Sequence, residues 1–121
     1  MCVDSTVFLV DDDAAVRDAL SISLVMAGFK IEVYPSGEAF LEAYTEYRRG
    51  CLLINLRQPD MEGLRVHQEL IKRNFVIPVI FMIHIGANEF LMSAIRREAF
   101  CLLEKPFSRA LLLDSIRNAM G

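Results

Sequence analysis

The amino-acid sequence predicts an α/β protein, a parallel sheet with helices on both faces. Short apolar runs alternate along the chain with segments whose apolar residues recur every three or four positions. Most of these runs lack the alternation of polar and apolar residues that is typical of strands with one solvent-exposed face. They therefore fit strands that are buried on both faces. The chain has 121 residues, 54% of them hydrophobic, and is expected to form a single domain over residues 1–121.

The first half of the chain predicts two strands, each followed by a helix. Thr6–Val10 is apolar and β-branched, as a buried strand requires. Asp13 stands where an N-cap belongs, and Gly28 provides the signal that ends the helix. Lys30–Tyr34 alternates polar and apolar residues, which is typical of an edge strand, and Ser36 is expected to cap the second helix.

The second half predicts three more strands, and a helix is expected after each. The strands are expected at Cys51–Ile54, Pro78–Ile83 and Cys101–Leu103. Asn88 and Ser108 are the expected caps of the fourth and fifth helices. The third helix carries His67, which we expect at the surface.

Composition excludes several classes of protein. A net charge of −3 leaves no large positive field, so we expect no nucleic-acid binding through this domain. No apolar run is long enough to cross a bilayer and no signal peptide is visible, so we expect a cytoplasmic protein that does not bind membranes. Cys51 and Cys101 begin strands that are not neighbours, too far apart for a disulfide, and are expected to be small core residues.

Polar residues gather at the expected strand ends. Asp11 and Asp12 follow the first strand, Asn55 ends the third, and Lys105 follows the fifth. In an open parallel sheet the functional crevice lies at the carboxyl ends of the strands. Carboxylate oxygens there suit Mg²⁺, and a lysine ammonium suits a carboxylate or a phosphoryl group.

The chain resembles the receiver domain of two-component response regulators, those of the nitrogen-fixation regulator type above all. The resemblance covers about Val7 to Met120 and is carried by the stretches Val7–Asp13, Leu56–Gly63 and Leu103–Phe107. It implies a doubly wound, flavodoxin-like (βα)5 fold whose five parallel strands have the order 2-1-3-4-5.

The resemblance also implies roles for individual residues. In the family, a histidine kinase donates a phosphoryl group to an aspartate at the end of the third strand, with Mg²⁺ bound beside it. The implied metal ligands here are Asp11, Asp12, the residue at position 55 and the carbonyl of Arg57. Lys105 is the implied phosphoryl contact, and the Lys105–Pro106 bond is expected to be cis.

The sequence departs from the family at the phosphoacceptor and at two switch positions. Asn55 replaces the acceptor aspartate, and a neutral amide cannot form the acyl phosphate. The lost charge is expected to weaken Mg²⁺ binding, although the Asn55 carbonyl oxygen can still ligate the metal. Ile83 stands where the family has a Ser or Thr hydroxyl, and Leu102 where it has an aromatic side chain.

These departures predict a receiver-like module that is not an enzyme and acts through protein contacts without phosphorylation. The expected partners are a histidine kinase, an output domain, or a second copy bound through the fourth helix, fifth strand and fifth helix. Residues expected on that face are Leu91, Ile95, Arg97 and Leu111.

Two alternatives stay open. One is an ordinary phosphoacceptor receiver, with Mg²⁺-dependent transfer from histidine to aspartate, in which Asn55 is an engineered substitution. The other is a small metal- or phosphate-binding enzyme that uses Asp11, Asp12 and Lys105.

Overall fold

The computed structural model describes residues 5–45, 48–56, 62–84, 93 and 101–121. They form one parallel sheet of order β2-β1-β3-β4-β5, which confirms the predicted order. The strands are β1 (Thr6–Val10), β2 (Lys30–Tyr34), β3 (Gly50–Asn55), β4 (Val79–His84) and β5 (Cys101–Lys105). The described helices are α1 (Ala14–Met26), α2 (Gly37–Ala43), α3 (Glu62–Lys72) and α5 (Arg109–Met120).

The fourth predicted helix, with its expected cap Asn88, lies outside the described residues. So do three of the four residues predicted on the interaction face, namely Leu91, Ile95 and Arg97.

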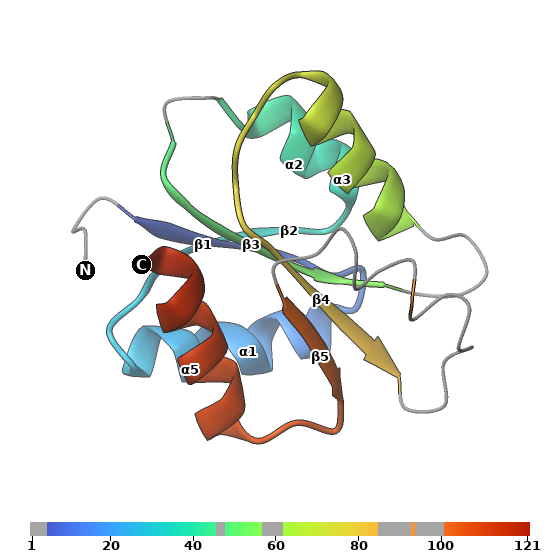
Figure 1. Ribbon diagram of the computed structural model, residues 1–121. Helices are drawn as coiled ribbons and strands as arrows, with labels where there is room; N and C mark the ends of the chain where they lie inside the picture. The colour runs from blue at the N-terminus through green and yellow to red at the C-terminus, as the bar shows by residue number, and fades with distance from the viewer. Residues whose placement is uncertain (1–4, 46–47, 57–61, 85–92, 94–100) are drawn as a thin grey trace.

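The helices cover the sheet from both sides, as Figure 1 shows: α2 and α3 lie on one face, α1 and α5 on the other. Alternate side chains of the central strands point into two separate cores. Phe8, Leu52 and Phe81 pack under α2 and α3. Leu9, Leu53 and Met82 pack under α1 and α5. Burial on both faces explains why these strands are apolar throughout.

Three of the predicted helix caps are confirmed. The Asp13 carboxylate accepts hydrogen bonds from the amides of Ala15 and Val16 at the start of α1. The hydroxyls of Ser36 and Ser108 accept from the third amide beyond them, at the starts of α2 and α5. Each cap satisfies amides that have no partner within the helix.

β1 and β2 have the predicted bounds, whereas those of β3, β4 and β5 differ from the prediction by one or two residues. The differences at the carboxyl ends of these strands affect the positions of polar residues. Pro78 precedes β4 and contributes only its carbonyl, which accepts from the Leu52 amide. β3 extends to Asn55 and β5 to Lys105, where Lys105 lies beside His84 of β4. The polar residues at positions 55 and 105 are therefore held in the sheet.

His67 corrects the prediction of a surface histidine. Its side chain is buried on α3, with its ring perpendicular to that of Phe81 at 6.1 Å between centroids. The helix turns this position toward the sheet, where an aromatic ring packs well.

The two cysteines that the structure describes are free, as predicted. Cys51 is fully buried in β3, and this burial raises the pKa of its thiol to about 12. A thiol in this state is a packing residue with little nucleophilic character.

The edge strand β2 is stabilised by polar side chains. Glu32 forms an ion pair with Arg48, and the Tyr34 hydroxyl donates to the Glu32 carboxylate at 2.7 Å. The hydrogen bond from Arg48 holds the pKa of Glu32 below its usual value. Burial, together with the bond to Glu32, raises the pKa of Tyr34 to about 12. Arg48 also lies over the Phe8 ring, so the ion pair of Arg48 and Glu32 closes one end of the core beneath α2.

None of the helices within the described ranges has the length and apolar character needed to span a membrane.

Candidate functional site

The sheet brings the predicted site residues to one edge. Val10 pairs with Ile54 in neighbouring strands, so Asp11, which follows β1, and Asn55, which ends β3, lie at the same level. Lys105 ends β5 and reaches across β4, where its Nζ donates a hydrogen bond to Asn55 Oδ1 at 2.9 Å. The predicted convergence of these side chains is therefore present in the fold.

Asp11 is almost fully buried, with 2% of its surface exposed. Its Oδ1 accepts from the Asp13 amide at 3.0 Å, and its backbone carbonyl accepts from Arg17 Nη1 at 2.6 Å. Its Oδ2 is buried without a hydrogen-bond partner among the described residues. A buried carboxylate oxygen without a donor is costly unless a cation or water satisfies it.

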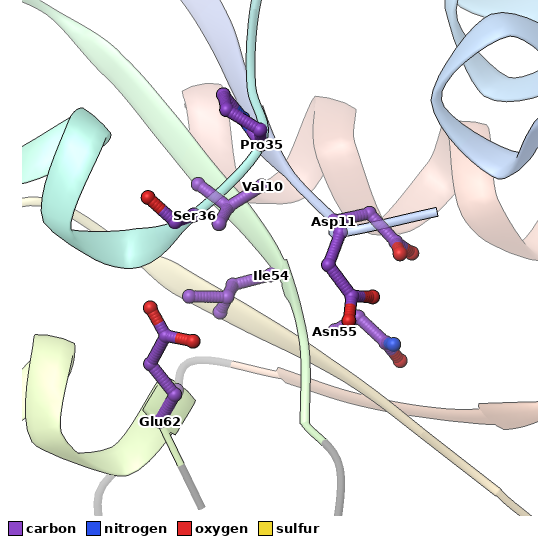
Figure 2. A pocket seen from close by; sticks show the side chains of 9 residues that line it. Val10, Asp11, Pro35, Ser36, Ile54, Asn55 and Glu62 are labelled. Atoms are coloured by element: carbon purple, nitrogen blue, oxygen red, sulfur yellow. The ribbon is translucent and has the colours of Figure 1, made fainter. Parts of the chain in front are cut away.

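A cavity of about 40 Å³ opens beside Asp11 and Asn55. Figure 2 shows the two side chains together on one side of it, with Glu62 and Ser36 on the other. This volume holds a few water molecules, which need about 10 to 15 Å³ each by the same measure. The full lining consists of Val10, Asp11, Asp12, Pro35, Ser36, Ile54, Asn55, Glu62 and Gly63.

Glu62 also lines this cavity, although no pattern in the sequence singled it out. Its Oε1 accepts from the Gly37 amide at 2.8 Å, which joins the start of α3 to the start of α2. A Cβ at Gly37 would overlap the Val66 side chain, so only glycine permits this approach. The contact joins residues 25 positions apart, and no local pattern signals it.

The donor set fits a divalent cation of the Mg²⁺ type. Asp11 and Asp12 supply carboxylates at the cavity, Asn55 supplies an amide oxygen, and a cation would satisfy the unpartnered Asp11 Oδ2. Such a cation would neutralise negative charge on a bound oxyanion. The fourth predicted ligand, the carbonyl of Arg57, lies outside the described residues. Within the described part of the chain, no three His, Cys, Asp or Glu side chains form a metal-binding group.

The side chains at the two predicted switch positions pack among apolar residues. Ile83 is 2% exposed and packs in the core beneath α2 and α3. Leu102 is half-buried and packs against the same core. Neither side chain offers a hydrogen-bond donor.

One residue predicted on the interaction face can be located. Leu111 of α5 is half exposed, at 50% of its surface. Its role in a protein contact stays a prediction, and its expected neighbours on the preceding helix lie outside the described residues.

A family model described as the response regulator receiver domain matches residues 7–117. The chain belongs to this family. Receiver domains are signalling domains of two-component systems and are not typically enzymes, and they generally use Mg²⁺ for phosphorylation.

Curated relatives support the assignment. The receiver domain is 34% identical over 117 residues to the transcriptional regulatory protein TdiR of Thauera aromatica, covering 97% of this chain and 52% of TdiR. It is 34% identical over 116 residues to the transcriptional regulatory protein FixJ of Rhizobium meliloti, covering 96% of this chain and 57% of FixJ. The chain thus spans about half the length of these relatives.

Solved structures agree with the fold. The crystal structure of FixJ-N has a TM-score of 0.88 and 34% identity, covering 98% of this receiver domain and 95% of that chain. A CheY-like receiver from Methanospirillum hungatei has a TM-score of 0.82 and 25% identity, and the match covers 98% of this chain and 95% of that chain. The predicted resemblance to FixJ-type receivers is therefore confirmed.

Proposed function

We propose that this receiver domain works in two-component signalling as a protein-interaction module that is independent of phosphorylation. The observation that carries the proposal is the hydrogen bond from Lys105 to Asn55. The position expected to accept the phosphoryl group holds an amide, and its oxygen is already bound by the lysine expected to contact that group.

The chemistry of an amide supports this role. The Asn55 side chain is neutral, and its nitrogen lone pair is delocalised into the carbonyl, so it is a poor nucleophile toward phosphorus. The apolar side chain of Ile83 supports the same conclusion, because it stands where the family has a hydroxyl and cannot hydrogen-bond to a phosphoryl oxygen. Leu102 lacks the aromatic ring that the family has at its other switch position. We therefore expect no phosphorylation at position 55.

Weak Mg²⁺ binding belongs to the same proposal. An aspartate at position 55 would add a third negative charge beside Asp11 and Asp12, and cation affinity rises with the number of charged ligands. With two carboxylates and an adjacent ammonium group, we expect the affinity to be lower than with three carboxylates.

The proposed partners are proteins: a histidine kinase, an output domain or a second copy of the chain. One proposed face is the fourth helix, β5 and α5, with Leu91, Ile95, Arg97 and Leu111. The net charge of −3 argues against nucleic acid as the ligand, and we propose a cytoplasmic location and no enzymatic activity.

The test compares the natural chain with Asn55→Asp. Each is mixed with Mg²⁺ and then with beryllofluoride, a stand-in for the phosphoryl group, while amide NMR shifts are recorded. We expect shifts near Asp11, Asp12 and Lys105 with Mg²⁺, and no further change with beryllofluoride in the natural chain. Asn55→Asp should respond to both.

A second readout is covalent. Acetyl phosphate with Mg²⁺ should add the mass of one phosphoryl group to Asn55→Asp and none to the natural chain. Phosphorylation of the natural chain, or beryllofluoride shifts that spread to β5 and α5, would contradict the proposal.

A further inference from the structure

A groove lies between α2 and α3, which run side by side on one face of the sheet (Figure 1). Its volume is about 630 Å³. Sites for small ligands in proteins typically measure about 300 to 1,000 Å³. The groove is distinct from the cavity beside Asp11 and Asn55, and the two have Ser36 and Glu62 in common among the residues that line them. Its size therefore suits a ligand of its own.

Two hydrogen bonds hold the walls of the groove together, one toward each end. At the helix starts, Glu62 Oε1 of α3 accepts from the Gly37 amide of α2 at 2.8 Å. At the other end, Arg73, which follows α3, donates from Nη1 to the Leu41 carbonyl of α2 at 3.2 Å. Arg73 also donates from Nε to Glu69 at 3.0 Å. The groove is therefore preformed, which lowers the entropic cost of binding a ligand.

One charged side chain on each wall is left without a partner. Glu38 of α2 and Arg65 of α3 line the groove and are exposed. Neither forms an ion pair or a hydrogen bond with any other residue that the structure describes. Leu41 and Val66 add an apolar surface to the same groove. The groove thus offers a carboxylate on one wall, a guanidinium group on the other and an apolar floor.

These features are complementary to a zwitterion with an apolar body. A cationic group on the ligand would satisfy Glu38, and a carboxylate would satisfy Arg65, whose guanidinium group matches a carboxylate in shape. Packed helices have axes about 8 to 10 Å apart, and an extended chain spans about 3.3 to 3.6 Å per residue, so about two to three residues cross the groove. A single amino acid is too short to reach both walls.

We propose that the groove between α2 and α3 binds a short peptide with free ends and an aliphatic side chain. The ammonium group at its amino end pairs with Glu38, and the carboxylate at its other end pairs with Arg65. The aliphatic side chain packs on Leu41 and Val66. This site goes beyond the proposed function and does not depend on the chemistry at position 55.

Titration with the dipeptide Leu-Leu, followed by amide NMR shifts, tests the proposal. Shifts are expected in α2 around Glu38 and Leu41 and in α3 around Arg65 and Val66. N-acetyl-Leu-Leu lacks the ammonium group, and Leu-Leu amide lacks the carboxylate. Each blocked peptide should bind roughly two- to fivefold more weakly than Leu-Leu, which is the contribution of one solvent-exposed ion pair.

Substitutions on the two walls assign each charge to its partner. Glu38→Gln should weaken Leu-Leu binding roughly two- to fivefold and leave the affinity for N-acetyl-Leu-Leu unchanged, because that peptide has no ammonium group to pair. Arg65→Gln should weaken Leu-Leu binding to a similar extent and leave the affinity for Leu-Leu amide unchanged. All three comparisons use the whole chain, and circular dichroism confirms that each variant is folded.

Matched controls remove the same charges outside the groove. Glu42→Gln on α2 and Lys72→Gln on α3 change exposed residues that do not line it, so both should bind Leu-Leu like the natural chain. These controls separate a local ion pair from a general effect of net charge.

Three results would overturn the proposal. The first is an absence of shifts in α2 and α3 up to the solubility limit of Leu-Leu. The second is an equal affinity for Leu-Leu and either blocked peptide, which would exclude a zwitterionic ligand. The third is a loss of Leu-Leu affinity in Glu42→Gln or Lys72→Gln as large as in Glu38→Gln or Arg65→Gln. None of these results depends on whether position 55 accepts a phosphoryl group.

Discussion

Lys105 and Asn55 join the ends of two strands that do not touch each other. Lys105 ends β5, Asn55 ends β3, and the 2.9 Å hydrogen bond between them crosses over β4. The bond satisfies the Asn55 oxygen and holds the lysine ammonium beside Asn55, which lines the same cavity as Asp11 and Asp12. This hydrogen bond is the observation on which the proposed function rests.

Replacing Lys105 should tighten Mg²⁺ binding. In Lys105→Met the positive charge beside Asn55 is lost from the edge of the sheet where Asp11 and Asp12 also lie, so the affinity for Mg²⁺ should rise roughly three- to tenfold. Loss of the hydrogen bond should lower the free energy of unfolding by about 1 kcal/mol. An NMR titration with Mg²⁺ and a urea denaturation curve measure the two effects. Lys72→Met, an exposed change in α3, is the control, and an unchanged Mg²⁺ affinity in Lys105→Met would contradict the prediction.

Gly37→Ala should destabilise the domain because its new Cβ would overlap the Val66 side chain. We expect a loss of roughly 1 to 3 kcal/mol in the free energy of unfolding, since two helices must separate to admit a methyl group. The double variant with Val66→Ala should lose less than the sum of the single changes, because the overlapping atom is gone. Strict additivity in denaturation experiments would show that the two residues are not in contact.

Glu62→Ala should weaken the start of α2. The change removes the acceptor of the Gly37 amide and should cost about 1 kcal/mol, whereas Glu62→Gln keeps an oxygen there and should cost about half as much. Chemical denaturation of both variants measures the difference. Glu38→Gln, an exposed change in α2, controls for loss of a carboxylate near the same helix start. Equal losses for Ala and Gln would rule out the hydrogen bond as the cause.

Glu32 should make stability dependent on pH. The hydrogen bond from Arg48 lowers its pKa from the ordinary value of 4.5. The stabilisation is therefore complete above 4.5, where the unfolded state is also ionised, and is lost as pH falls through the lower folded pKa. Both side chains are about one-third exposed, so the pair contributes roughly 0.5 to 1 kcal/mol.

Unfolding at several pH values checks this. The difference in unfolding free energy between the natural chain and Glu32→Gln should be largest near neutral pH and should shrink as the pH falls below 4.5. Glu42→Gln, exposed on α2, should show no such trend. A difference that grows on acidification would have the wrong sign.

Much of the site could be predicted from the sequence, because its residues stand at the carboxyl ends of strands. The runs Thr6–Val10 and Cys51–Ile54 are apolar enough to be parallel strands, and parallel strands bring their carboxyl ends to one edge. The residues that follow them, Asp11 and Asn55, had to meet there. Lys105 came to the same edge for the same reason. The caps Asp13, Ser36 and Ser108 were predictable because capping is local.

Other features required the tertiary structure, because they depend on which faces pack together. The sequence could not show that α3 turns His67 into the core, or that Glu62 reaches the Gly37 amide 25 residues away. It also could not show which apolar residues of α1 stay exposed, since one helix carries apolar positions on more than one side. The sequence alone determined which polar side chains follow which strands at this edge of the sheet. Packing decided which groups are hydrogen-bonded there, and which apolar side chains of α1 stay exposed, because each depends on contacts between segments distant in the chain.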